Sequence, residues 1–166
     1  MSKKINLLET GNMLLAAQKI VLCCHVSPDG DTLGSALGLA RLLEQKGKEV
    51  TVFVDDDINK SLNFIPGIEK VQRPEADVIV EADLFVVVDA SSFDRVGICN
   101  EVVKAPVLLN IDHHISNTEF ADYLYLDAEA AAAGEIMCDL FEAMGWEYDE
   151  AIAIDFYTAI TTDCGS

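Results

Sequence analysis

Short apolar runs that end in aspartate or histidine are the feature of this sequence that most restricts its fold. Three runs rich in valine, leucine and isoleucine span residues 20–24, 84–88 and 107–111. Runs of this length and composition are typical of strands buried on both faces of a parallel sheet. The residues that follow them, His25, Asp89 and Asp112, would then meet at the carboxyl edge of the sheet, where open α/β folds bind their ligands.

Helical segments separate the predicted strands. The spacing of apolar residues predicts a further strand over 49–54 and helices over 5–18, 32–46, 128–144 and 148–160. Gly30, Gly34 and Gly38 recur along the second helix, and we expect them to allow close packing of that helix on the sheet. Strands that alternate with helices imply parallel βαβ units, so the sequence predicts an α/β fold.

Composition and charge restrict the class of protein. The 166 residues are 51% hydrophobic, which is enough for one domain with a sizeable core. The sequence has no apolar segment of membrane-spanning length and no signal-peptide core, so we expect a cytoplasmic protein without membrane contact. Its five cysteines lack C-x-x-C spacing and are expected to be reduced. The formal net charge of −18 would repel a long nucleic acid.

The segment from His25 to Asp31 is the densest group of candidate ligands. It places one imidazole and the carboxylates of Asp29 and Asp31 directly after an apolar run. This combination suits Mn²⁺ or another borderline divalent ion better than a structural zinc site, which usually recruits thiolates. Alternatively, the segment is a polar turn in which Asp31 caps the next helix.

The remaining histidines support a metal site. His113 and His114, like His25, follow an apolar run and lie beside an acid, and the sequence has only these three histidines. Because several strand ends supply metal-binding groups, a shared site explains the pattern better than coincidence. The acidic triplet at residues 55–57 also follows a predicted strand. Consecutive acids there are more often a solvated turn, with a metal site as the alternative.

The order of these motifs resembles the four-motif signature of the DHH phosphoesterase superfamily. The motifs are His25-x-x-x-Asp29-x-Asp31 with Gly34-Ser35, then Asp89, then Asp112-His113-His114, and then Asp163. Residues 27–35 and 111–118 are most similar to the bacterial nanoRNase branch, whose members degrade oligoribonucleotides and dephosphorylate phosphoadenosine phosphate. The resemblance implies a three-layer α/β/α, Rossmann-like DHH domain over residues 1–166 and a manganese-dependent phosphoesterase.

The resemblance also implies a pair of Mn²⁺ ions, or Mg²⁺ in their place, held by aspartate and histidine side chains. The ligands of the first ion would be His25, Asp29 and Asp89. The ligands of the second ion would be Asp31, Asp89, His113 and Asp163, with Asp89 shared between the two. Such a pair activates a water for attack on phosphorus.

Three further residues would serve the substrate. By resemblance, Asp112 orients the histidines, His114 faces the scissile phosphate, and Ser35 helps to seat that phosphate. The expected substrate is a short oligonucleotide or a nucleotide phosphate. The alternatives are a cyclic dinucleotide or pyrophosphate as substrate, or a metal-binding domain that is catalytically silent and serves in oligomerisation.

The sequence also departs from the superfamily. Relatives complete this domain and add a smaller one with a basic, glycine-rich surface, whereas these 166 residues stop after the fourth motif. The resemblance therefore predicts a truncated domain that binds metal, hydrolyses nucleotides weakly or not at all, and can form a homo-oligomer through uncovered apolar helix surface. Since four site aspartates should repel one another without metal, we also expect raised carboxylate pKa values.

Overall fold

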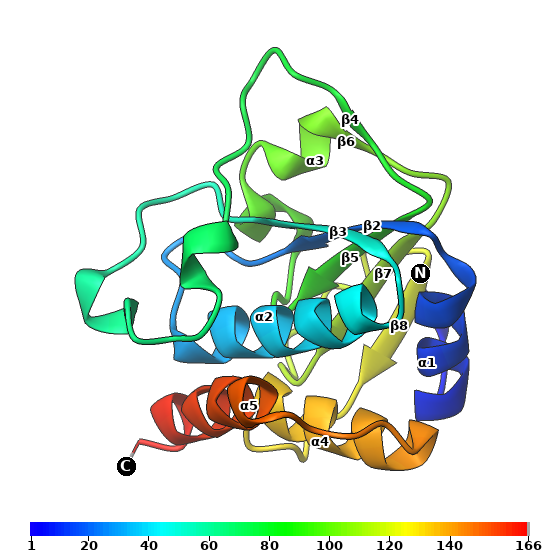
Figure 1. Ribbon diagram of the computed structural model, residues 1–166. Coiled ribbons are helices and arrows are strands. Elements are labelled where there is room, and N and C mark those ends of the chain that lie inside the picture. The colour runs from blue at the N-terminus through cyan, green and yellow to red at the C-terminus, as the bar shows by residue number, and fades with distance from the viewer. Residues whose placement is uncertain (166) are drawn as a thin grey trace.

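A six-stranded parallel sheet forms the centre of the computed structural model, which describes residues 1–165 (Figure 1). The strands follow in the spatial order β1-β8-β7-β5-β2-β3, and every neighbouring pair is parallel. Their bounds are β1 Lys3–Lys4, β2 Lys19–Cys23, β3 Glu49–Phe53, β5 Leu84–Val88, β7 Leu108–Asp112 and β8 Tyr123–Leu126. A separate small sheet pairs β4 (Val80–Glu81) with β6 (Val103–Lys104). The predicted α/β fold is confirmed.

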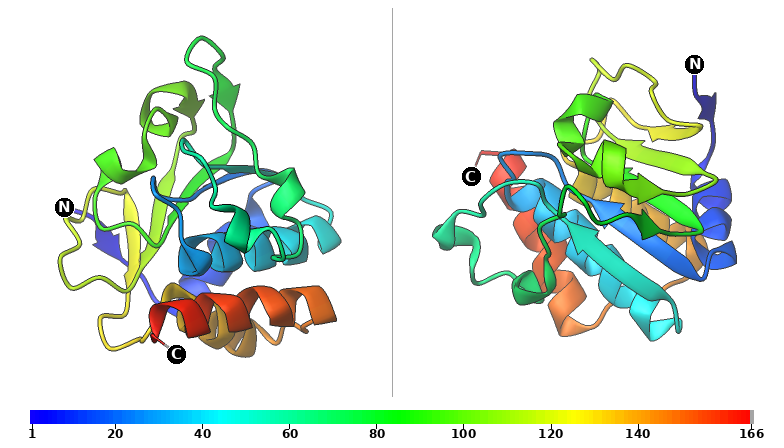
Figure 2. Two further views of the ribbon diagram at one scale, coloured as in Figure 1. Left: turned by 90° about the vertical axis from the view of Figure 1, so that its left-hand side faces the viewer. Right: turned by 90° about the horizontal axis from the view of Figure 1, so that it is seen from above.

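Helices cover the two faces of the central sheet unequally (Figures 1 and 2). One face carries α1 (Leu7–Ala16), α2 (Gly30–Gln45), α4 (Ala133–Met144) and α5 (Glu150–Asp163). The other face carries only short elements, which are the 3₁₀ helix η3 (Phe93–Val96) and α3 (Cys99–Val102). Two more 3₁₀ helices, η1 (Lys60–Leu62) and η2 (Ile68–Lys70), lie between β3 and β4. The predicted three layers are present, with one outer layer thin.

Alternation along β2 shows how the two cores form. Ile20 and Leu22 face the larger core, which they share with the long helices. Val21 and Cys23 face the smaller core beside η3 and α3. Because both faces are covered, β2 is apolar at successive positions, and this explains why its sequence shows a continuous apolar run.

The glycines of α2 face α5, and the prediction that they pack against the sheet is wrong. A Cβ atom at Gly34 would meet the backbone oxygen of Asp155, and one at Gly38 would meet the ring of Phe156. Glycine every fourth residue forms a stripe along one side of a helix. This stripe lets α5 approach α2 closely enough to carry its last turn to the edge of the sheet.

Several element boundaries differ from the predicted ones. α4 begins at Ala133 rather than at residue 128, because Asp127 accepts a hydrogen bond from the Glu129 backbone nitrogen and holds the preceding residues in a turn. α5 continues to Asp163, so this carboxylate lies on the last turn of a helix and not at a strand end. Within residues 1–165, no helix has the length and apolarity needed to cross a membrane.

Candidate metal centre

The first group of candidate ligands lies where β2 and β5 end. The Nε2 atom of His25 lies 3.6 Å from an oxygen of Asp29 and 3.5 Å from Oδ2 of Asp89. His25 and Asp89 are buried, whereas Asp29 is more exposed. Each of the three side chains offers a ligand atom within 4.8 Å of the others, which is the spacing expected around one cation.

The second group collects residues from three other elements. The Nε2 atom of His113, which follows β7, lies 3.6 Å from oxygens of both Asp31 and Asp163. The same nitrogen lies 3.3 Å from Oδ1 of Asp89, whose other oxygen faces His25. Asp89 therefore lies between the two groups. We call the six residues the aspartate–histidine cluster: His25, Asp29, Asp31, Asp89, His113 and Asp163.

The backbone at Asp89 is held in an unusual conformation. Its φ is +61°, in the left-handed region that costs a residue other than glycine on the order of 1 kcal/mol. The backbone nitrogen of Asp89 donates to the Ile111 carbonyl at 2.9 Å, and this hydrogen bond continues the ladder between β5 and β7 past the strand end. The sheet thus fixes the conformation that turns the carboxylate between His25 and His113.

Asp31 is held by the start of another helix. Its carboxylate accepts hydrogen bonds from the backbone nitrogens of Ala133 at 2.8 Å and Gly134 at 2.9 Å, and from the Ser35 hydroxyl at 3.3 Å. Asp29, not Asp31, caps α2, since its side chain accepts from the Thr32 backbone nitrogen. The alternative interpretation, in which Asp31 caps the helix, is therefore wrong, because Asp29 is the capping residue.

Ser35 lies behind the cluster rather than at its open side. The residue is fully buried, and its hydroxyl donates to Asp31. In this structure the side chain therefore orients a carboxylate. The expected role of Ser35 in seating a phosphate stays a prediction.

A buried polar network orients His114. Its Nδ1 atom lies 2.7 Å from Oδ1 of Asp112, which is fully buried. Asn117 donates to the second oxygen of Asp112 and to the side-chain oxygen of Asn110, both at 2.7 Å. Asn110 in turn donates to two carbonyl groups at the end of β5. Sequence reasoning missed both asparagines, although Asn110 interrupts an apolar run where a polar residue is costly unless it has partners.

The acidic triplet at residues 55–57 does not join the cluster. Asp55 accepts a hydrogen bond from the Ile98 backbone nitrogen, and Asp56 accepts one from the Ser27 backbone nitrogen, both at 2.8 Å. Asp57 forms an exposed ion pair with Arg73. These contacts favour the turn interpretation, and they tie the loop of the first motif to its surroundings.

His25 and His113 have raised pKa values at the positions where a cation would lie. Burial opposes protonation of His25, but the nearby carboxylates of Asp29 and Asp89 outweigh it and raise its pKa to about 10. The Asp89 carboxylate, 3.3 Å away, is the main cause that raises the pKa of His113 to about 9, against the effect of burial. A divalent cation can replace such protons, because it neutralises the same carboxylates.

The carboxylates of the cluster titrate differently from one another. Burial, reinforced by the nearby charge of Asp89, raises the pKa of Asp31 to about 7, and burial also raises the pKa of Asp163. The pKa of Asp29 does not show the expected rise. Burial acts on it too, but the His25 side chain and the Thr32 amide outweigh burial and lower its pKa. The expected rise in pKa therefore holds for Asp31 and Asp163 and not for Asp29.

The side chains fit a divalent metal. Oδ1 of Asp89 and Nε2 of His113 are buried without a hydrogen-bond partner in the described part of the chain. Buried polar atoms normally have such a partner. A buried oxygen and nitrogen that face each other without one therefore indicate a ligand-binding position. Carboxylate oxygens combined with imidazole nitrogens suit Mn²⁺ or a similar ion.

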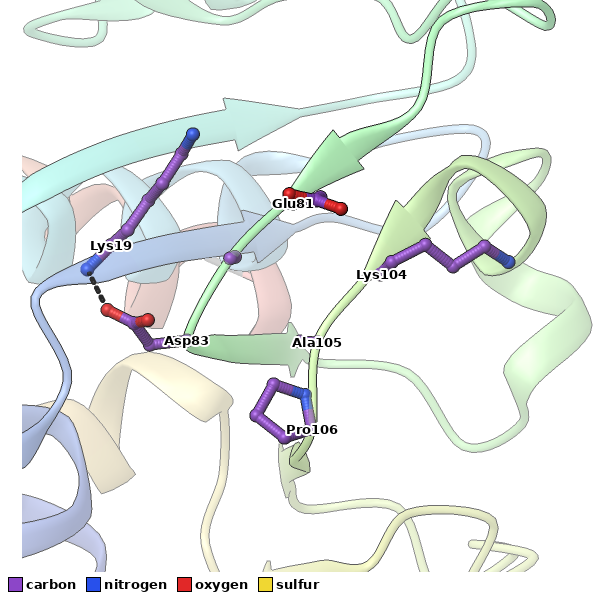
Figure 3. Close-up of a pocket in the computed structure, with 7 residues that line it drawn as sticks. Lys19, Glu81, Asp83, Lys104, Ala105 and Pro106 are labelled. Carbon is purple, nitrogen blue, oxygen red and sulfur yellow. Dashed lines mark hydrogen bonds between the residues drawn. The ribbon is translucent and has the colours of Figure 1, made fainter.

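An open pocket at the other end of the strands lies apart from the cluster. It has a volume of about 520 Å³ and is lined by Lys19, Glu81, Asp83, Lys104 and Pro106, among others (Figure 3). Its acidic residue Asp83 accepts hydrogen bonds from the backbone nitrogens of Gln18 and Lys19, as the dashed line for Lys19 shows. This carboxylate fixes the start of β2, which is a structural role.

Comparison with known proteins gives a consistent result. The family model described as "DHH family, N-terminal domain" matches residues 19–163. The chain is 35% identical over 150 residues to the bifunctional oligoribonuclease and PAP phosphatase NrnA of Thermus thermophilus, covering 89% of this chain and 44% of that protein. It is 31% identical over 168 residues to the NrnA of Mycoplasma pneumoniae, covering 97% and 51%.

A solved structure agrees with these relatives. The crystal structure of an exopolyphosphatase-related protein from Bacteroides fragilis superimposes with a TM-score of 0.88 at 28% identity, covering 96% of this chain and 50% of that one. The chain thus spans about half the length of the relatives that it matches.

Proposed function

The chain belongs to the DHH family, and from this premise we propose that it is the phosphoesterase domain of a nanoRNase-like enzyme. The proposed substrates are short oligoribonucleotides and nucleotide phosphates such as phosphoadenosine phosphate, in line with the names of its relatives. The observation that supports the proposal best is the aspartate–histidine cluster, in which two groups of ligand atoms lie on either side of Asp89.

We assign the cluster to two divalent ions, with Mn²⁺ as the proposed metal. His25, Asp29 and Asp89 would hold one ion, and the second would be held by Asp31, Asp89, His113 and Asp163. When bound, such a pair supplies a water of lowered pKa and neutralises negative charge on the phosphate oxygens.

His114 and Asp112 would act on the substrate from beside the cluster. Asp112 accepts a hydrogen bond from Nδ1 of His114 and so fixes the orientation of the imidazole. Nε2 of His114 is then left free for the substrate. The side chain is 43% exposed, so a substrate can reach it. This arrangement follows the general rule that an acid–base histidine is oriented by a carboxylate on its other nitrogen.

The test is hydrolysis of the dinucleotide pApA and of phosphoadenosine phosphate with Mn²⁺, using the parent chain and His114→Ala. We expect turnover by the parent and a loss of roughly 100-fold or more in His114→Ala, because general acid–base groups contribute at least this much. Metal binding should be retained in the variant. Exposed Asp77, which contacts no residue of the cluster, provides the control Asp77→Ala, which should match the parent.

Two other results would require a different function for the chain. If the parent binds Mn²⁺ but hydrolyses neither substrate, the chain is a metal-binding domain without activity of its own. If it hydrolyses only pyrophosphate or a cyclic dinucleotide, the alternative substrates apply.

A further inference from the structure

Arg95 occupies a fixed position at the rim of the cluster. It lies in η3, and its backbone oxygen accepts a hydrogen bond from the Val26 nitrogen at 2.7 Å. The next residue, Val96, is fully buried in the smaller core. The loop that carries the first motif and the helix that carries Arg95 are thus joined, while the Arg95 side chain remains exposed.

The guanidinium of Arg95 reaches the side of His25 that faces away from the carboxylates. Its Nη2 atom lies 3.3 Å from Nδ1 of His25, and the Val26 carbonyl lies 2.7 Å from the same nitrogen. Nδ1 cannot donate to Val26 and accept from Arg95 at once. When Nε2 binds a cation, Nδ1 must carry the hydrogen and donates to Val26. Arg95 then has no acceptor on His25 and is available to another group.

Arg95 differs from the other basic residues near this end of the sheet. Arg73 is engaged with the carboxylates of Asp55 and Asp57. Among residues 1–165, Arg95 is the one lysine or arginine whose side chain contacts a member of the cluster, and it forms no ion pair with a carboxylate there. In a chain of net charge −18, this cation is the local attraction for an anion.

We propose that Arg95 is a substrate-binding residue that donates to a non-bridging phosphate oxygen on the His25 side of the cluster. The inference deepens the proposed function and rests on it. A guanidinium presents several N–H donors in one plane and matches the oxygens of a phosphate, which a lysine does less well. The acidic domain would therefore supply part of its own phosphate-binding site, in addition to any basic surface elsewhere in the protein.

The test is calorimetric titration of adenosine 5′-monophosphate into the chain saturated with Mn²⁺, with Mn²⁺ affinity measured separately. The variants are Arg95→Ala, Arg95→Lys and the control Arg73→Ala, which removes the same charge from an exposed ion pair. We expect Arg95→Ala to weaken nucleotide binding roughly 10- to 100-fold, the effect of losing a hydrogen bond to a charged group. Arg95→Lys should recover part of the loss.

The readouts separate this inference from the proposed function. Unchanged Mn²⁺ affinity in Arg95→Ala, together with parent-like nucleotide binding in Arg73→Ala, supports a direct phosphate contact. The inference fails if Arg95→Ala binds the nucleotide as the parent does, or if Arg95→Ala and Arg73→Ala lose nucleotide affinity equally. It also fails if Arg95→Ala loses Mn²⁺ binding, or if the Mn²⁺-loaded parent binds no nucleotide. A parent chain that binds no Mn²⁺ would instead overturn the proposed function, and the inference with it.

Discussion

At the scale of single residues, the site depends on pairs in which one side chain fixes another. Asp112 accepts from His114, and Asn117 holds Asp112 in turn. Ser35 and two backbone amides hold Asp31 in the same way. Asp31 therefore keeps its orientation without a ligand, because its partners include groups other than the histidines.

The Asp112→Asn substitution tests this orientation. The variant keeps the size of the side chain but removes the negative charge that faces Nδ1 of His114. We expect turnover of pApA to fall roughly 100-fold while Mn²⁺ affinity changes little, since Asp112 is not among the proposed ligands. Steady-state kinetics and calorimetry on the same preparation measure the two effects. Equal loss of metal binding and turnover would instead give Asp112 a place among the ligands.

The residues of the cluster could be predicted from the sequence because each belongs to a short motif next to an apolar run. Arg95 and Asn110 were missed because their roles depend on contacts with other segments of the chain, whereas Asn117 was missed although its partners lie five and seven positions before it. Arg95, for example, meets His25 across 70 positions. No local pattern signals a contact of that kind, and only the fold brings the two side chains together.

At the scale of elements, the contact between α2 and α5 positions the fourth motif. Helix α5 crosses α2 along its glycine stripe and brings Asp163 to within 3.6 Å of His113. The strands were predicted well, since a run buried on both faces is continuously apolar. The short strand β8 and the start of α4 were not, because pairing with β7 and the turn at Asp127 decide them.

Gly34→Ala tests the helix contact. The added methyl group would meet the Asp155 backbone oxygen, which cannot move without α5. We expect the free energy of unfolding to fall by about 2 kcal/mol, a usual cost of overpacking, and Mn²⁺ affinity to fall with it. Urea denaturation measures the first effect. The control is Gly145→Ala at the end of α4, where the strain of a positive φ acts alone because nothing lies near the new atom. If Gly34→Ala retains full Mn²⁺ affinity, the helix contact does not position Asp163.

Asp155, on α5, makes the stability of the chain depend on pH. The residue is fully buried, and both its oxygens lack a hydrogen-bond partner within the described residues. Burial raises its pKa to about 7, with Arg41 opposing and Asp149 adding to the rise. The folded chain must therefore release a buried proton above pH 7, and this costs stability that the chain keeps at pH 4.

The Asp155→Asn variant should remove this cost. At pH 8 we expect it to be more stable than the parent by roughly 2 kcal/mol, and at pH 4 to differ little. Urea denaturation at the two pH values measures the difference. An equal effect at both would show that the charge of Asp155 is not its cause.

At the scale of the whole molecule, an acidic chain concentrates carboxylates at one edge of its sheet and balances them with two protonated histidines. His25 and His113 have raised pKa values, so the folded chain holds protons that the unfolded chain releases. The stability that they contribute is complete below pH 6.5, their ordinary pKa, and is lost as pH rises toward 9 and 10.

The melting temperature of the metal-free chain should therefore fall as pH rises from 6.5 to 9. Excess Mn²⁺ should raise Tm at every pH and most at high pH, because the ions replace the protons that the histidines lose. Differential scanning calorimetry with EDTA or with Mn²⁺ measures both curves. A metal-free Tm that stays level or rises across this range would contradict the electrostatic description of the cluster.

The most direct measurement of the central claim is the number of Mn²⁺ ions bound, by titration calorimetry on the parent, Asp89→Ala and the exposed control Asp77→Ala. Because the two oxygens of Asp89 face the two ligand groups, one substitution should affect both ions. The account predicts two ions on the parent and on Asp77→Ala, and loss of both on Asp89→Ala. A parent that binds no Mn²⁺, or an Asp89→Ala variant that binds as the parent does, would contradict it.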